Sequence, residues 1–114
     1  MITALTRDGE PVCPQCWVAD TPIRRMRGLL GRTRLGENEG LLLRPASMIH
    51  TWFMRFSIDA VFLDRDLRVL RVAEDVRPWR MRAARGAKAV LELPAGAAAR
   101  WALQPGEQLA LAPR

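Results

Sequence analysis

The chain has 114 residues, of which 49% are hydrophobic and 26% are charged, and its net charge is +6. This length fits one domain, and the absence of a run of 18 apolar residues argues against a transmembrane helix. Two cysteines are too few for a disulfide framework, and the first residues do not resemble a signal peptide, so we expect a cytoplasmic protein.

The positive charge by itself is weak evidence for a nucleic-acid partner. Arginine supplies 17 of the 18 basic residues, and Lys88 is the other. Together with the abundant alanine, this bias toward arginine can reflect genomic composition. The positions of the charges therefore matter more than their sum.

The N-terminal third is expected to hold a flexible segment, a strand and a helix. Residues 1–10 are polar and predicted to be flexible, and residues 11–114 are predicted to form a single β-rich domain. Residues 11–19 are typical of a strand, which Pro14 would confine to a sheet edge or a bulge.

An amphipathic helix is predicted over residues 22–31. Asp20 or Thr21 can cap it, Pro22 suits its first position, and Gly31 suits its end. Four apolar residues recur at helical spacing: Ile23, Met26, Leu29 and Leu30.

The rest of the chain consists mostly of short β-rich runs bounded by turn residues. These runs are 40–43, 48–54, 59–64, 67–73, 89–93 and 108–112. Residues 64–66 are expected to turn a hairpin, 77–88 to form a long mobile loop, and 97–102 to form a second short helix. The pattern predicts a mainly β fold, either a compact small barrel or a sandwich, with one N-terminal and one short C-terminal helix.

Five motifs together resemble one protein family. They are R-x-x-G-L-L at 25–30, G-L-L-L at 40–43, H-T-W-F-M-R-F-S-I-D-A-V-F-L-D at 50–64, V-L-E-L-P-A-G at 90–96 and P-G-E at 105–107. In this order they resemble the bacterial and archaeal family called domain of unknown function 192. The resemblance spans about residues 12–112 and implies a compact, mainly β domain with a helix near the N-terminus. It implies no particular activity, and the Cys13–Cys16 motif is not part of the family pattern.

The stretch 47–64 holds the only histidine of the chain and alternates in the manner of a strand. Its polar residues suggest a small pocket in which His50, Thr51 and Arg55 bind an anionic or polar ligand. The alternative is that His50 is an ordinary core residue with its hydrogen bonds satisfied.

Asp59 lies in the same stretch between Ile58 and Ala60, so its carboxylate is expected to be buried. A buried carboxylate needs either a cation or backbone N–H donors. Arg25 is the preferred partner because both residues lie in family motifs, which predicts a structural ion pair between helix and strand.

Catalytic and metal sites are weaker interpretations. Ser47 or Ser57 with His50 and Asp59 could form a hydrolytic triad, but no G-x-S-x-G turn is present. Cys13, Cys16, His50 and a carboxylate could form a zinc site, but His50 is far from the two thiols in the sequence and the chain has no second histidine, so we assign no metal and no cofactor. The Cys-x-x-Cys is followed by a strand-like run rather than a helix, which favours two ordinary thiols.

The basic segment 77–88 offers a second possible surface. A tryptophan stands among its positive charges, as in surfaces that bind phosphates and stack bases. The possible polyanion contacts are Arg77, Trp79, Arg80, Arg82 and Arg85. A solvated loop with Trp79 folded back onto the core is the preferred interpretation.

The sequence therefore favours a binding module without enzymatic activity, with a shallow site near His50–Asp59 for a small ligand or a protein. Binding of polyanions or nucleic acid through 77–88 is one alternative. An enzyme that uses His50 and Asp59 is the other.

Overall fold

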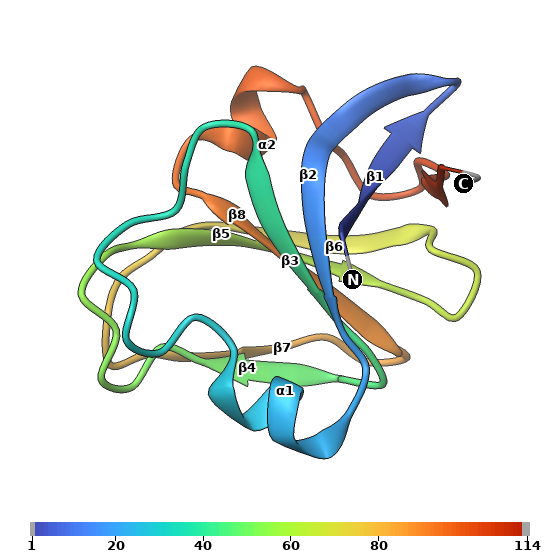
Figure 1. Cartoon of the computed structure of the whole chain (residues 1–114). Helices are drawn as coiled ribbons and strands as arrows, with labels where there is room; N and C mark the ends of the chain where they lie inside the picture. Colours follow the sequence, from blue (N-terminus) through green and yellow to red (C-terminus); the bar gives the residue numbers. More distant parts are fainter. Residues whose placement is uncertain (1, 113–114) are drawn as a thin grey trace.

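The computed structural model describes residues 2–112, except for the side chains of Met26 and Arg27. A curled seven-stranded sheet and a separate two-stranded sheet make up the fold, with two short helices (Figure 1). The strands are β1 (Ile2–Arg7), β2 (Glu10–Ala19), β3 (Glu39–Leu43), β4 (Met48–His50), β5 (Ile58–Leu63), β6 (Val69–Val76), β7 (Met81–Ala83), β8 (Ala89–Pro94) and β9 (Ala110–Leu111). The helices are α1 (Pro22–Arg27) and α2 (Ala97–Arg100), and neither is long enough to cross a membrane.

The mainly β class is confirmed, but the sheet does not close into a barrel. Its strand order is β6-β5-β8-β3-β2-β1-β9, and only β2 and β3 pair in parallel. Near the two edges, a bridge between Arg68 and Gln108 and backbone hydrogen bonds between residues 67–69 and 106–109 join the starts of β6 and β9. This short contact does not supply the continuous ladder that a closed barrel needs.

Two segments expected to be irregular form strands. Residues 2–7 are not a flexible tail but form β1, because Leu5 is fully buried and the strand pairs with both β2 and β9. The loop expected over 77–88 contains β7, which pairs with β4. Both segments are ordered because they pair with other strands, which their own polar composition does not reveal.

The hairpin at 64–66 is confirmed, whereas two predicted elements are shorter than expected. The strand expected over 48–54 ends at His50, where the backbone turns. The helix expected over 22–31 ends at Arg27, and Gly28 follows with a φ of 48°. Of its predicted apolar stripe, Leu29 is buried and Ile23 is 78% exposed, while the side chain of Met26 lies outside the described residues.

The large sheet separates two hydrophobic cores. The first lies on the side of β1, β9 and α2 and includes Val61 and Leu91. The second lies between the sheet and the β4–β7 layer and includes Ala60, Phe62 and Val90. Strands β5 and β8 contribute to both cores, because consecutive side chains of a strand point to opposite faces.

The two cysteines belong to the first core. Cys13 and Cys16 are free thiols on β2, and the strand pairing shifts register between them, at Pro14. The hydrogen bond with Cys16, together with burial, raises the pKa of the Cys13 thiol. Cys13 is thus neutral at neutral pH, as buried structural cysteines generally are.

Candidate functional site

A cavity of about 100 Å³ lies between α1, the segment that follows it, and the second core. Strands β3, β4 and β8 supply its other walls. Its lining is mostly aliphatic, and the polar side chains are those of Arg25, His50 and Glu92. The complete lining is Arg25, Gly28, Leu29, Leu30, Leu43, Met48, Ile49, His50, Met54 and Glu92.

Glu92 lies at the inner end of this cavity. It is the fourth residue of β8, paired with Leu41 on one side and Ala60 on the other, in the middle of the sheet. The residue is 4% exposed, and its carboxyl group has no hydrogen-bond or ion-pair partner among the described residues. Burial raises the pKa of Glu92 to about 8.

A carboxyl group with this pKa is mostly protonated at neutral pH. Glu92 therefore presents one O–H donor and one carbonyl acceptor to the cavity, rather than a negative charge. A neutral carboxyl group is the form that an apolar wall tolerates, because desolvation penalises the charged form.

His50 and Arg25 lie nearer the mouth of the cavity. His50 is exposed, its ring centroid lies 4.9 Å from that of Trp52, and its Nδ1 accepts a 3.4 Å hydrogen bond from the Trp52 N–H. Arg25 is half-buried, and its Nη1 lies 3.5 Å from the carbonyl oxygen of Arg44. That single long hydrogen bond leaves most of the guanidinium donors of Arg25 available.

Thr51 and Arg55 do not join His50 in this cavity. Thr51 is fully buried, and its Oγ1 donates to the Arg77 carbonyl oxygen at 2.6 Å and accepts from the Arg80 N–H at 2.9 Å. Thr51 therefore fastens the segment after β4 to the segment before β7. Arg55 is exposed on the surface.

Asp59 is buried, but its partners are backbone N–H groups. Its Oδ1 accepts from Asp75 at 2.9 Å, and its Oδ2 accepts from Gly96 at 3.0 Å and from Ala98 at 2.9 Å. The carboxylate thus caps the first turn of α2 from a neighbouring strand. The ion pair expected with Arg25 is not formed among the described residues, since Arg25 lies on the other side of the sheet with α1.

The residues of the other proposed sites are also separated. Asp59 faces α2, whereas His50 lines the cavity on the opposite side of the sheet. Neither Ser47 nor Ser57 lines the cavity, and Cys13 and Cys16 belong to the first core. No group of metal ligands is assembled among residues 2–112.

The basic segment 77–88 exposes its aromatic residue. Trp79 is 56% exposed, and its ring centroid lies 4.7 Å from that of Phe53. The Trp79 ring therefore does not fold back onto the core. Four arginines of the segment, Arg77, Arg80, Arg82 and Arg85, are exposed or half-buried beside it.

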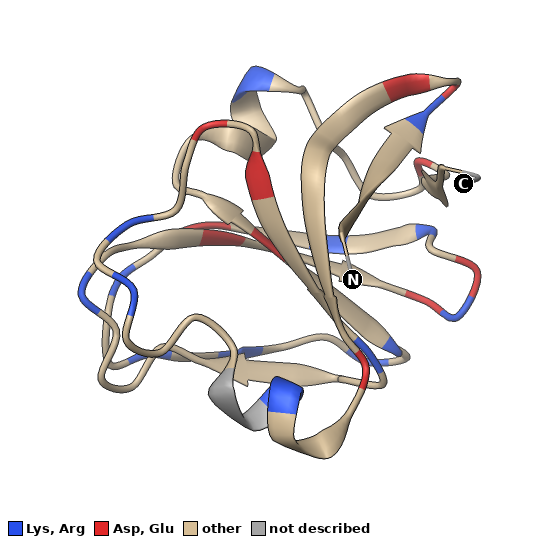
Figure 2. Cartoon of the chain, viewed as in Figure 1, with Lys and Arg blue, Asp and Glu red and all other residues tan. Residues whose placement is uncertain are grey.

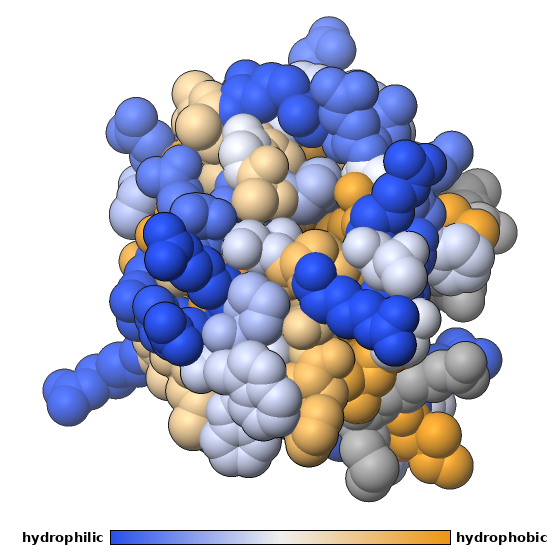
Figure 3. Space-filling model, turned by 90° about the vertical axis from the view of Figure 1, so that its left-hand side faces the viewer, coloured by the Kyte–Doolittle hydropathy of each residue, from blue (hydrophilic) through white to orange (hydrophobic). Residues whose placement is uncertain are grey.

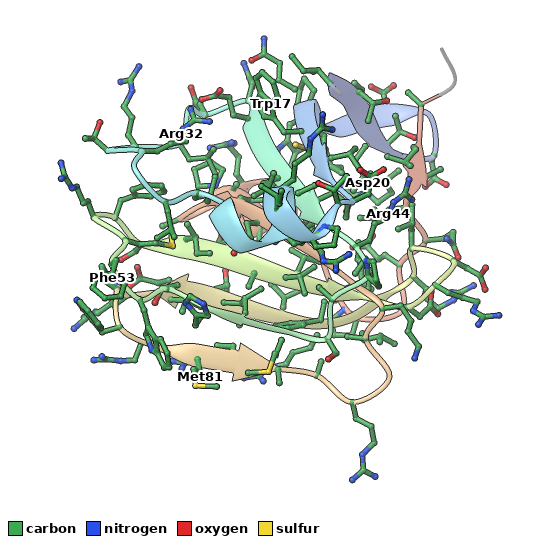
Figure 4. All side chains as sticks on the ribbon, turned by 60° about the horizontal axis from the view of Figure 1, so that its bottom comes forward. Trp17, Asp20, Arg32, Arg44, Phe53 and Met81 are labelled. Carbon is green, nitrogen blue, oxygen red and sulfur yellow. The ribbon has the colours of Figure 1, made fainter. Side chains whose placement is uncertain are left out.

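A larger hollow of about 570 Å³ lies on the other side of the segment 28–31, against β2 and β3. Trp17 and Arg32 line it, and Figure 4 shows both on the far side of α1 from Phe53 and Met81. Its charged residues, Arg24 and Arg32, are not buried, and Arg32 is paired with Glu39 at 3.0 Å. The smaller cavity is the better candidate, because a largely buried acid, Glu92, lines it with no partner in the part of the chain that the structure describes.

Sequence reasoning passed over Glu92, although a signal was present. The run Ala89–Leu93 is apolar apart from Glu92, which is the same pattern that drew attention to Asp59. A single acid in a short alternating strand is usually placed on a solvent-facing side. Only the packing of β8 between the two cores, one of which contains Leu91 and the other Val90, shows that both faces of this strand are covered.

Comparison with known proteins identifies one family over most of the chain. The family model DUF192, described as uncharacterised, matches residues 3–111. A UPF0127 protein of Thermococcus sibiricus is 36% identical over 84 residues, which cover 69% of this chain and 54% of that protein. The chain thus spans about half the length of this curated relative.

Two solved structures share the fold. A protein of unknown function from Novosphingobium aromaticivorans superposes with a TM-score of 0.81 at 28% identity, over 96% of this chain and 84% of that one. A Sinorhizobium meliloti protein superposes with a TM-score of 0.78 at 24% identity, over 85% and 81% of the two chains, and shows the fold alone. Since the family model spans nearly the whole chain, the protein belongs to the DUF192 family of uncharacterised proteins.

Proposed function

We propose that the protein is a binding module for a small organic carboxylate, which it holds in the cavity between α1 and β8. One observation carries this proposal: Glu92 is only 4% exposed, and its carboxyl group reaches the cavity without a partner among the described residues. Buried polar groups are nearly always hydrogen bonded, so one without a partner suggests a ligand that satisfies it.

The charges at the cavity favour an anionic ligand. At neutral pH Glu92 is protonated and can donate its O–H, and Arg25 carries a positive charge at the wall. A carboxylate could accept from both, and charge-assisted hydrogen bonds are the stronger kind. An ammonium group would meet the positive charge of Arg25 and find only a neutral carboxyl group.

The volume limits the ligand to a short chain. An apolar cavity of about 150 Å³ accommodates benzene, so about 100 Å³ suits roughly four to six heavy atoms. Leu29, Leu43 and Met54 supply apolar walls for the rest of such a molecule. Propionate and butyrate have the corresponding size and polarity.

Binding is favoured over catalysis because the cavity lacks a nucleophile. Its lining among the described residues contains no serine, threonine, cysteine or lysine. His50 and Glu92 could exchange protons with a ligand, but nucleophilic catalysis needs a further group. Polyanion binding through 77–88 would not use the cavity, because no residue of this segment is among its lining residues.

The test is a titration of the protein with propionate, in which the backbone amides are monitored by nuclear magnetic resonance. Parallel titrations with propylamine and propanol are the comparison. We expect saturable shifts confined to residues around the cavity for propionate only. Affinity should fall about tenfold between pH 7 and about pH 9, because ionised Glu92 repels the ligand carboxylate.

Three variants sharpen this titration. Glu92→Gln keeps a donor and should bind propionate with no pH dependence in this range. Arg25→Gln should weaken binding about tenfold, the usual worth of a charge-assisted hydrogen bond. Glu107→Gln, which removes an acid far from the cavity, is the matched control and should bind as the unmodified protein does. Preference for propylamine, or shifts that do not saturate for any of the three compounds, would refute the proposal.

A further inference from the structure

The outer surface of the β4–β7 layer carries an unusual concentration of exposed apolar side chains. Met48 is 47% exposed, Phe53 70% and Trp79 56%. Trp52, Met81 and Leu30 are also more than a third exposed. These six residues, which we call the docking face, are Leu30, Met48, Trp52, Phe53, Trp79 and Met81.

Contacts connect the members of this face. His50 pairs with Met81 across the two strands, so Met48, His50 and Met81 share one face. The His50 ring lies against Trp52, and the Phe53 ring lies against Trp79. Leu30 and Met48 both line the cavity. Figure 4 shows Met81 on the outer side of the layer and Phe53 at its end.

The backbone holds two of the aromatic side chains in this exposed position. Phe53 and Trp79 have φ values of 65° and 67°, a region that bulky residues rarely adopt. The buried Thr51 bonds to the backbone on both sides of Trp79, at Arg77 and Arg80. Conformations of this kind persist only where surrounding structure enforces them, and they cluster at functional sites.

The charge carried by the β4–β7 layer itself has one sign. Residues 44–57 and 77–88 form this layer and its loops, and they contain seven basic residues and no acidic one, although Asp20 and Asp64 line a hollow beside Arg44 and Lys88. The basic residues are Arg44, Arg55, Arg77, Arg80, Arg82, Arg85 and Lys88. Figure 2 shows blue and no red on β7 and on the loop at its left-hand end. In Figure 3, which looks at this end of the molecule, pale and apolar side chains lie low on the surface with blue ones above and beside them.

We propose that the docking face binds the surface of an anionic lipid membrane. Trp and Phe rings prefer the boundary between headgroups and acyl chains, and nearby arginines are attracted to anionic lipids. A second copy of the chain would bring two positively charged faces together, which opposes self-association. Nucleic acid is disfavoured because methionine and leucine side chains, which do not stack on bases, make up half of the face.

The location of the cavity fits this arrangement without depending on the ligand proposed above. Leu30 and Met48 belong both to the docking face and to the cavity lining. A membrane-bound protein would therefore have the mouth of its cavity beside the lipid surface.

The test is cosedimentation of the unmodified protein with vesicles of phosphatidylcholine, either alone or with about 30% phosphatidylglycerol. We expect binding to the anionic vesicles only, and a decrease in that binding as salt increases. Tryptophan fluorescence should shift to shorter wavelength on binding and should be quenched by brominated lipid. A protein that binds single-stranded DNA but not anionic vesicles, or that binds neutral vesicles equally well, would overturn the proposal.

Variants assign the binding to this face. Phe53→Ser with Trp79→Ser should weaken vesicle binding about tenfold or more, because both side chains lose their burial in the lipid. Arg55→Gln with Arg77→Gln should weaken it by a similar factor. Trp17→Ser and the pair Arg65→Gln with Arg68→Gln, which lie elsewhere, are the matched controls. If the controls weaken binding as much as the face variants do, the docking face is wrongly assigned. The fluorescence of the unmodified protein tests insertion even if a variant fails to fold.

Discussion

The two sides of the large sheet each bury one carboxyl group, and they treat it differently. Asp59 on β5 faces α2 and accepts three backbone hydrogen bonds between 2.9 and 3.0 Å. Glu92 on the adjacent β8 faces the second core, with no partner among the described residues and a pKa raised to about 8. Burial alone therefore does not distinguish an acid that is fixed by the fold from one that is left available to a ligand. The hydrogen-bond partners do.

This difference follows from where the chain places its backbone donors. The first turn of a helix has N–H groups without intrahelical partners, and α2 directs those of Gly96 and Ala98 at Asp59. The second core consists of aliphatic side chains around Glu92, which can only desolvate it. The first carboxyl group stabilises the fold, and the second costs stability and remains available to a ligand.

The largest expected effect is the loss of stability on Asp59→Ala. This change strands three backbone N–H groups, each of which costs about 1–3 kcal/mol when buried without an acceptor. We expect the free energy of unfolding to fall by about 4 kcal/mol, measured by urea denaturation at pH 7. Asp59→Asn, which retains one acceptor oxygen, should lose about half as much.

A loss on Asp59→Ala of less than about 1 kcal/mol would show that the α2 cap is not a structural anchor. Comparison with Arg25→Ala distinguishes this cap from the Arg25–Asp59 ion pair expected from the sequence. Arg25→Ala should cost little stability in the structure described here. If it cost as much as Asp59→Ala, an Arg25–Asp59 pair would have to be reconsidered.

The next largest effect is a gain in stability, expected on Glu92→Gln. Because the folded protein raises the pKa of Glu92 from 4.5 to about 8, it binds more protons than the unfolded chain between these values. Its contribution to stability is therefore lost progressively as pH rises from about 4.5 to 8. At pH 7 this cost is about 3 kcal/mol, and Glu92→Gln should recover most of it.

The measurement is urea denaturation of both proteins at several pH values from about 5 to 9. The stability difference should grow with pH and level off above about pH 8. Glu107→Gln, which removes a half-buried acid paired with Arg7 far from the cavity, controls for the general effect of one less acid. If Glu92→Gln destabilises the protein at every pH, Glu92 has a partner that the structure does not show.

Much of the fold could be predicted from local patterns, and what was missed depends on contacts between distant segments. The runs at 40–43, 59–64 and 89–93 are apolar apart from three acids, and they form most of β3, β5 and β8. By contrast, β1 is only half apolar and β7 has three residues, and pairing with β2 and β4 makes them strands.

Of the candidate site, only His50 could be predicted from the sequence, because the roles of the other residues depend on contacts between distant segments. His50 drew attention as the only histidine, and the structure places it at the cavity. Thr51 and Asp59 drew attention as polar residues in an apolar run, but their partners are backbone groups of residues 16 or more positions away. Glu92 was missed because nothing in its own neighbourhood indicates that β8 is covered on both faces.

The titration of Glu92 itself tests the account most directly. Carbon-13 labelling of the glutamate side chains allows each carboxyl resonance to be followed with pH, and Glu92→Gln identifies the resonance of Glu92. We predict that this one carboxyl group titrates near pH 8 in the free protein. A midpoint near 4.5, the ordinary value for glutamate, would contradict the account. Glu92 would then be ionised at neutral pH and could not donate a hydrogen bond to a bound carboxylate.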